Sequence, residues 1–401
     1  MKRRLCLLLA LLLMVSLLPV GAAAADAGWK EAYRAFVLDY GYRSSGQKYF
    51  DTVQNAVFHE DIRVYLHDMD GDGTPELLLS TGGGSMADMT NYVYRYVNGR
   101  VTYAGNAGQR GALLCYAPGT AYRGVFDWTG NMGWMPAMYY SLKSGSVRSE
   151  RVVVTEDTDA GRQITRRETT DDGLFEAFLI AYGVDRAKLA ESVRSHGPNR
   201  FLPMATIPQI RNLGWDAFVR GAAIAEQFLD VPLDAYYTLP VDWAANHEPQ
   251  ITQGTSATMF SPDAACTRGQ VVTFLWRAKG CPEPKSSASP FTDVNVNDYY
   301  GKAVLWAVEN GVTQGMGDGL FAPDATVTRA QVVTFLWRAE GQPTASSTNP
   351  FIDVPAGEYY AVPVLWAVAN NITQGTSSNT FSPNDPCTRA QIVTFLYRAL
   401  S

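Results

Sequence analysis

Apolar side chains recur at helical spacing in the C-terminal half of the chain. Within residues 299–310 they recur at intervals of three and four, which is typical of a helix with one buried face. Gly311 is a signal for the end of that helix. The next segment, 314–327, is rich in Gly, Asp and Pro and predicts a loop. A second amphipathic helix is expected from Thr328, which completes a helix–loop–helix pattern.

This pattern occurs three times. The motifs Phe-x-Asp-Val, Tyr-Tyr, Phe-x-Pro and Thr-Arg-x-Gln follow one another in the same order in each copy, beginning at Phe228, Phe291 and Phe351. Matches at so many positions predict three repeats of one structural unit. Segments rich in Ser, Pro and Gly serve as linkers between them. The predicted repeats are 228–280, 291–341 and 351–401.

A capping box is expected where the second helix of each repeat begins. A Thr and the Gln three positions later satisfy two free backbone N–H groups. An Arg occupies the first helical position, although a helix N-terminus disfavours a cation by ~0.3–1 kcal/mol. One interpretation is an anion pocket formed by free N–H groups and the guanidinium. The alternative is that Thr and Gln only cap, while Arg pairs with an Asp of the loop. The residues are Thr267, Arg268, Gln270, Thr328, Arg329, Gln331, Thr388, Arg389 and Gln391.

These motifs resemble S-layer homology domains, which occur in threes at one end of bacterial surface proteins. The resemblance covers residues 228–401. It implies an all-α pseudo-threefold bundle whose grooves bind an acidic secondary cell-wall polymer, often a pyruvylated glycan. It also implies that Arg268, Arg329 and Arg389 contact that acidic ligand.

The repeats depart from the family pattern at two positions. Gln stands at the third helical position, where the family most often has Glu, and Gly269 stands where it most often has Ala. Because Gln caps as well as Glu does, the fold is expected to survive. The exact ligand stays open.

The first 25 residues have the pattern of a secretory signal peptide. Lys2, Arg3 and Arg4 precede an apolar stretch at 5–20, and small residues follow at 21–25. Cleavage is expected near Ala25. The apolar stretch is short for a membrane span, and nothing later is longer, so the alternative of a single-span anchor is less favoured.

The segment 26–227 predicts an α+β module with antiparallel sheet. A helix is expected at 29–40 and a strand at 62–66, and Asn98-Gly99 between alternating segments indicates a β-hairpin. Further strands are expected at 112–116, 122–128, 137–142, 152–155 and 163–167, and helices at 174–182, 186–195 and 215–227.

An Asp-rich loop lies between two strands of this module. Its sequence begins like an EF-hand loop, but the twelfth position is Leu79 and the flanks are strands, so it is not an EF-hand. Carboxylates at alternate positions around glycines converge on one hard cation, and a structural Ca²⁺ is expected. A solvated acidic turn is the alternative. The expected ligands are the side chains of Asp68, Asp70, Asp72 and Glu76 and the carbonyl of Thr74.

Composition narrows the function. With 18% charged residues and a net charge of −6, a broad basic patch for nucleic acid is not expected. Four His and five Cys argue against zinc chemistry and a disulfide framework. Cys266 and Cys387 occupy the same repeat position, and we expect equivalent positions to lie far apart and unpaired.

The favoured function is a secreted bacterial surface protein held to the wall polymer by its repeats. No Gly-x-Ser-x-Gly or His-Glu-x-x-His motif occurs. The alternative is a wall or polysaccharide hydrolase with catalytic residues within 26–227. There His67 is a candidate ligand or base, while Cys115 has no His positioned nearby in sequence. Trp128 and Trp134 are candidates for sugar stacking, although aromatic residues in an alternating β pattern more often belong to a core.

Overall fold

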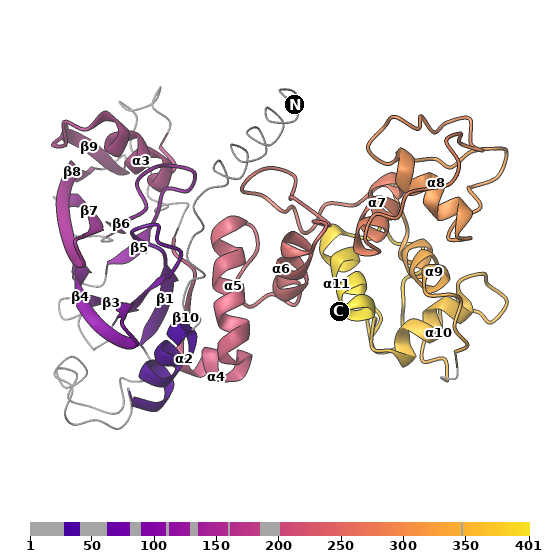
Figure 1. The fold of residues 1–401 in the computed structure, drawn as a ribbon, viewed down its shortest axis with the longest axis horizontal. Helices are drawn as coiled ribbons and strands as arrows, with labels where there is room; N and C mark the ends of the chain where they lie inside the picture. The colour runs from indigo at the N-terminus through magenta and orange to yellow at the C-terminus, as the bar shows by residue number, and fades with distance from the viewer. Residues whose placement is uncertain are drawn as a thin grey trace, which may run out of the picture. The chain divides into compact units, whose positions relative to one another are not determined.

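The computed structural model describes residues 28–40, 62–80, 90–109, 112–128, 135–158, 161–184, 201–345 and 348–401 (Figure 1). The chain divides into two compact units, Met1–Ala222 (unit 1) and Ala223–Ser401 (unit 2), and the boundary falls within helix α5 (Trp215–Gln227). The predicted signal peptide and the helix expected at 186–195 lie outside the described residues. In the part of the chain that is described, no helix is long and apolar enough to cross a membrane.

The described residues of unit 1 form two antiparallel sheets of five strands each, as expected for an antiparallel α+β module. The first has the order β10-β1-β2-β3-β4 and the second β5-β6-β7-β8-β9. The strands are β1 (Arg63–His67), β2 (Glu76–Ser80), β3 (Thr90–Val97), β4 (Arg100–Gln109), β5 (Leu113–Cys115), β6 (Val125–Trp128), β7 (Met135–Lys143), β8 (Ser146–Thr158), β9 (Gly161–Arg167) and β10 (Met204–Thr206).

The hairpin predicted at Asn98-Gly99 is confirmed. These two residues join β3 to β4 with φ of 49° and 78°, and such a left-handed pair matches the right-handed twist of the flanking strands. Ser144 and Gly145 make the same kind of turn between β7 and β8, with φ of 50° and 77°. Both turns therefore set the register of long hairpins.

Unit 1 also contains helices, and one of them shares an apolar core with the second sheet. The helix expected at 29–40 begins as α2 (Gly28–Arg34) and continues as the π-helix η1 (Ala35–Tyr40). Helix α3 (Asp172–Tyr182) packs Leu174 and Phe178 into one core with residues of the second sheet. Helix α4 (Ile207–Leu213) and strand β10, which pairs with β1, are not predicted by the residue pattern. Three residues are too few to show strand alternation.

Unit 2 has two helices in each repeat, as predicted. They are α6 (Thr238–Asn246) and α7 (Arg268–Ala278), α8 (Gly301–Glu309) and α9 (Arg329–Ala339), and α10 (Ala361–Ala369) and α11 (Arg389–Leu400). The repeats share one apolar core, in which Phe260, Phe321 and Phe381 are fully buried. Helix α7 contacts α8, α9 contacts α10, and α11 contacts α6. Each second helix therefore packs against the first helix of the next repeat, and the third repeat packs against the first.

The Phe-x-Asp-Val motif fixes the loop of each repeat. In the second repeat, Asp293 accepts hydrogen bonds from the N–H groups of Phe321 and Ala322, at 2.9 and 2.7 Å. Asp230 and Asp353 do the same in the other repeats. The carboxylate thereby holds the Phe-x-Pro segment in place, and the carbonyl of its Phe faces the preceding repeat.

The glycine that precedes this segment has no room for a side chain. Gly315 has φ of 85°, and a Cβ there would lie 2.5 Å from both the Phe291 ring and the Leu320 carbonyl oxygen. The equivalent glycines, Gly254 and Gly375, are equally enclosed. Only glycine satisfies both the left-handed conformation and the close approach.

Candidate functional sites

The capping boxes predicted for the second helix of each repeat are confirmed. Thr267, Thr328 and Thr388 each accept a hydrogen bond from the N–H three residues later, and the Gln side chain at that position accepts one from the Thr N–H. All six hydrogen bonds measure 3.1–3.3 Å. The helix starts are therefore fixed by residues close in sequence.

The Arg at each helix start is buried. The side chains of Arg268, Arg329 and Arg389 are 2%, 3% and 5% exposed. Each Nε donates a hydrogen bond of 2.8–2.9 Å to a Phe carbonyl of the neighbouring repeat, and each guanidinium also contacts two Phe rings, with Cζ 4.8–5.5 Å from the ring centres. The observed partner is thus a carbonyl rather than the loop Asp considered in the sequence analysis.

The backbone N–H groups at these helix starts are not free for an anion. The Arg268 N–H donates to the Ala325 carbonyl and the Gly269 N–H to the Pro323 carbonyl, both at 2.9 Å. The same two hydrogen bonds occur at the other helix starts. The prediction of an anion pocket made of free N–H groups is therefore wrong, because the loop of the neighbouring repeat occupies that place. We call each such assembly a repeat junction: the start of one second helix with the loop and Tyr-Tyr motif of the next repeat.

The three junctions differ in one hydrogen bond. The Nη2 of Arg389 donates to Thr252 Oγ1 at 3.1 Å, whereas the Nη2 atoms of Arg268 and Arg329 are buried and have no hydrogen-bond partner among the described residues. Burial lowers the pKa of all three guanidinium groups, that of Arg268 to about 10, so they stay charged at neutral pH. Leaving a buried donor unpaired costs about 1–3 kcal/mol.

Each junction also exposes a tyrosine. The first residues of the Tyr-Tyr motifs, Tyr236, Tyr299 and Tyr359, are 57–59% exposed, and each packs edge-on against the following Tyr. Partial burial raises the pKa of Tyr299 and Tyr359, and interaction with Thr267 and Thr328, respectively, lowers it. In the sequence these residues stand out only as markers of the repeat. Their recurrence as paired aromatics was the signal that could have identified them.

A ring of backbone hydrogen bonds joins the residues that precede the three capping Thr. The N–H of Cys266 donates to Cys387, that of Cys387 to Val327, and that of Val327 to Cys266, at 3.2, 3.0 and 3.0 Å. We call these three residues the central ring. The expectation that Cys266 and Cys387 lie far apart is therefore wrong. These equivalent positions meet where the three repeats come together, and only positions away from that point are far apart.

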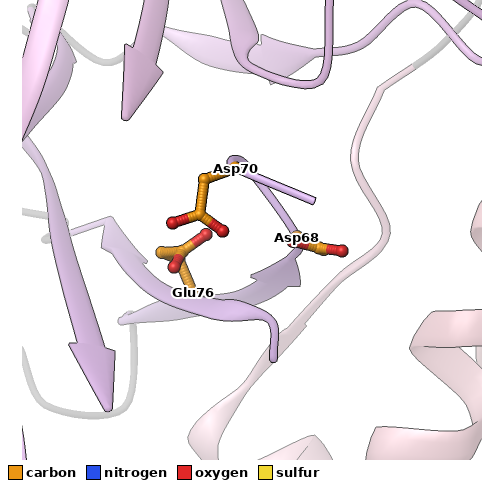
Figure 2. A group of neighbouring side chains, drawn as sticks. All are labelled: Asp68, Asp70 and Glu76. Carbon is orange, nitrogen blue, oxygen red and sulfur yellow. The ribbon is translucent and has the colours of Figure 1, made fainter. Parts of the chain in front are cut away.

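The Asp-rich loop joins β1 to β2 and brings together three of the expected ligands. One oxygen each of Asp68, Asp70 and Glu76 lies within 4.8 Å of the other two, and Figure 2 shows the Asp70 and Glu76 carboxylates facing each other. Asp72 is not in this group and accepts a hydrogen bond from the Thr74 N–H at 2.7 Å. Asp68 accepts bonds from the N–H groups of Gly71 and Gly73, which shape the turn.

The buried position of Glu76 distinguishes this loop from an ordinary acidic turn. Its side chain is 2% exposed, and burial raises its pKa to about 8, with a further increase from the nearby Asp carboxylates. Burial also raises the pKa of Asp70, and Arg95 approaches that carboxylate at 3.4 Å. A set of carboxylate oxygens around one buried acid fits a hard divalent cation, which would compensate their mutual repulsion.

The side chains of His67 and Cys115 are both buried within unit 1. His67 is buried, with Nε2 2.7 Å from the Arg123 carbonyl oxygen. Cys115 is fully buried, which raises its pKa well above the usual range and disfavours a reactive thiolate. Trp134 lies outside the described residues.

Comparison with known proteins identifies the repeats. The S-layer homology domain family matches residues 227–272, 290–333 and 350–393, so the chain carries three S-layer homology domains. A cell surface protein of Thermoanaerobacter kivui is 33% identical over 120 residues, which is 29% of this chain and 16% of that protein. The surface-layer 125 kDa protein of Lysinibacillus sphaericus is 33% identical over 117 residues, 29% of this chain and 10% of that protein.

Enzymes also share these domains. An endoglucanase of Bacillus sp. (strain KSM-635) is 38% identical over 93 residues, 23% of this chain and 10% of that enzyme, and hydrolase relatives match only the S-layer homology region. The chain spans about a sixth or less of the length of these three relatives. The domains and the surface-protein relatives together support a location at the cell wall or S-layer surface.

Proposed function

We propose that unit 2 holds this protein noncovalently on the bacterial surface by binding an acidic secondary cell-wall polymer, such as a pyruvylated glycan, and that unit 1 is displayed from it. The observation that carries the proposal is a buried guanidinium at every junction for which no described carboxylate forms an ion pair. The direct partners of this buried positive charge are a carbonyl and aromatic rings, and the loop Asp carboxylates act on it only from a distance, which favours an acidic ligand. A cleaved signal peptide fits this location.

The proposal includes a closed, pseudo-threefold arrangement of the repeats. Its support is the cyclic order of contacts, in which Arg268 reaches Phe321, Arg329 reaches Phe381 and Arg389 returns to Phe260. In such an arrangement the junctions of Arg268 and Arg329, which are alike, would offer the same groups to one polymer.

The junctions of Arg268 and Arg329 are the proposed polymer sites. Their Nη2 atoms are buried and lack a hydrogen-bond partner among the described residues, whereas that of Arg389 is already satisfied by Thr252. The exposed Tyr beside each capping Thr supplies a flat apolar surface of the kind on which a sugar ring stacks. Gln in place of Glu at the caps removes a negative charge from each helix start, which also favours an acidic ligand.

Cosedimentation of the full chain with purified cell walls tests the function. We expect the wild type to pellet with walls and to stay soluble once the acidic polymer has been extracted from them. Tyr299→Ala with Tyr359→Ala should weaken binding at least tenfold without loss of helix content. Ile352→Ala is the matched control, because Ile352 is 78% exposed and apolar but belongs to no junction. Equal binding to extracted and native walls would refute the proposal.

We also propose that the Asp-rich loop binds one structural Ca²⁺ through Asp68, Asp70 and Glu76, with Asp72 and the Thr74 carbonyl closing around it. The specific support is the buried Glu76 facing two further carboxylates. The cation would offset their repulsion and join β1 to β2, which the loop connects.

Thermal unfolding of the full chain with Ca²⁺ or with chelator tests this site. Ca²⁺ at 100 times its Kd should stabilise unit 1 by about 2.7 kcal/mol. Glu76→Gln should abolish that response, while Glu226→Gln, on helix α5, should retain it. An unchanged melting temperature of the wild type with Ca²⁺ and with chelator would contradict the proposal.

A further inference from the structure

The central ring places two cysteines opposite each other on repeats that the chain does not join directly. Linkers connect the first repeat to the second and the second to the third, whereas Cys266 belongs to the first and Cys387 to the third. Ala265 and Thr388 form an antiparallel bridge, and the Cys266 N–H donates to the Cys387 carbonyl at 3.2 Å. The two cysteines therefore come directly beside that isolated bridge on the two antiparallel segments, joined by one backbone hydrogen bond, while the Cys387 N–H donates to Val327.

This placement suits a covalent link. Opposed residues of an antiparallel pair have Cα atoms about 4.5–5.5 Å apart, and a disulfide bridges Cα distances of roughly 4.4–6.8 Å. Both side chains are buried, and both thiols are free in this structure. We propose that Cys266 and Cys387 form a disulfide when the chain folds outside the cell, and that this bond closes unit 2 between its first and third repeats. The oxidising environment it requires rests on the proposed surface location.

The reaction is thiol–disulfide exchange with an exogenous disulfide. The Cys266 thiolate attacks one sulfur of that disulfide, and the other sulfur leaves as a thiolate, which gives a mixed disulfide. The Cys387 thiolate then attacks the Cys266 sulfur, and the remaining half of the oxidant leaves as a second thiolate. One S–S bond forms and one breaks, the two cysteines lose two protons and two electrons, and the oxidant is reduced to two thiols.

The closed ring protects the thiols from this reaction. Burial raises the pKa of Cys266 to about 11 and that of Cys387 to about 12, although the nearby Arg389 lowers the former. The exchange therefore takes place before the ring closes or when it opens, when both thiols are no longer buried.

The third position of the ring supplies a control. Val327 occupies the place of the two cysteines in the second repeat and is fully buried there. Valine therefore fits this environment, and the double variant Cys266→Val, Cys387→Val should fold. Cys281→Ser is a second control, since Cys281 is half-buried and lies outside the ring.

The test is to refold the full chain with oxidised and reduced glutathione, alkylate it in denaturant and map its peptides by mass spectrometry without reduction. We expect a linked peptide pair that contains Cys266 and Cys387, in the wild type and in Cys281→Ser. Reduction should lower the melting temperature of unit 2 by roughly 5–15 °C in the wild type and leave the double Val variant unchanged. Alkylation of both ring cysteines after oxidative refolding, or pairing of either with Cys281, would overturn the inference. Wall binding of the double Val variant, measured in parallel, separates this outcome from failure of the proposed function.

Discussion

The Asp-rich loop of unit 1 is built from nine consecutive residues, 68–76, whereas each junction of unit 2 combines residues of two repeats that lie more than 50 positions apart. In the loop, the side chains that face one another are set by local turns. At a junction, the Arg is directed by a carbonyl that the next repeat delivers. The comparison shows that a motif can specify its own geometry in one case and depend on a distant loop in the other.

The two units also treat buried ionisable groups differently. Asp127 and Glu76 in unit 1 are acids whose pKa burial raises, to about 6 and about 8. They can take up a proton instead of remaining charged. The Arg of unit 2 cannot lose its charge at neutral pH, so its compensation comes from a carbonyl and aromatic rings.

The largest expected effect concerns the distant loop. Gly315→Ala should destabilise unit 2 by about 4 kcal/mol, because a Cβ would meet the Phe291 ring and a carbonyl oxygen in a left-handed residue. Gly311→Ala is the matched control, since Gly311 has φ of 68° but open space around its Cβ position, and should cost about 1 kcal/mol. Chemical denaturation followed by helical circular dichroism measures both. Equal losses of stability in the two variants would show that the enclosure of Gly315 by the Phe291 ring and the Leu320 carbonyl does not hold the loop.

The next effect concerns the buried acid Asp127, which can lose its charge, unlike the buried Arg side chains of unit 2. The pKa of Asp127 is about 6 in the folded protein against 3.8 ordinarily, mainly through burial. The contribution of Asp127 to the stability of unit 1 is therefore complete below pH 3.8 and is lost as the pH rises through 6. Asp127→Asn should therefore make unit 1 more stable than the wild type by about 3 kcal/mol at pH 8 and by little at pH 4. Asn can still accept from the Met138 N–H, as Asp127 does at 2.8 Å. Native-state hydrogen exchange in β7 at both pH values gives the comparison, and a pH-independent difference would contradict it.

A smaller effect sharpens the difference among junctions. Thr252→Val should leave the Nη2 of Arg389 without a partner and cost about 1 kcal/mol more than Thr313→Val. Each substitution also removes an equivalent hydrogen bond, which the Gly254 N–H donates to Thr252 and the Gly315 N–H to Thr313. The difference between the two losses of stability therefore isolates the contact with Arg389. Equal losses in urea denaturation would show that the third junction is no better satisfied than the others.

The smallest expected effect is that of salt on wall binding. Residues 228–401 hold 9 basic and 15 acidic side chains, a net charge of −6, so attraction to an acidic polymer must come from discrete sites. Buried charges are screened far less than exposed ones. Raising NaCl from 0.05 to 0.5 M should therefore reduce cosedimentation by no more than about threefold. A loss of a hundredfold would indicate diffuse surface attraction instead.

The elements predicted from the sequence are those decided within a few residues. The capping boxes, the Asn98-Gly99 hairpin and the paired helices of each repeat follow from spacing and turn chemistry over four to twelve positions. The grouping of Asp68, Asp70 and Glu76 was predicted for the same reason.

The features that sequence reasoning missed depend on contacts between distant segments. Strand β10 pairs with β1 across more than 130 residues, the Arg268 N–H meets a carbonyl 57 positions away, and Cys266 meets Cys387 across 121. The repeat pattern in the sequence shows that Cys266 and Cys387 occupy equivalent positions, but not whether these positions lie at the centre or at the edge of the assembled repeats.

The return of the third repeat to the first has a consequence for biosynthesis. The carbonyls of Phe260, Pro262 and Ala264 receive their hydrogen bonds from Arg389 and Ala390. The first repeat to leave the ribosome therefore waits for one of the last helices before its own loop is complete. A nascent chain that ends before Arg389 would leave these carbonyls without their partners and the loop of the first repeat accessible to proteases.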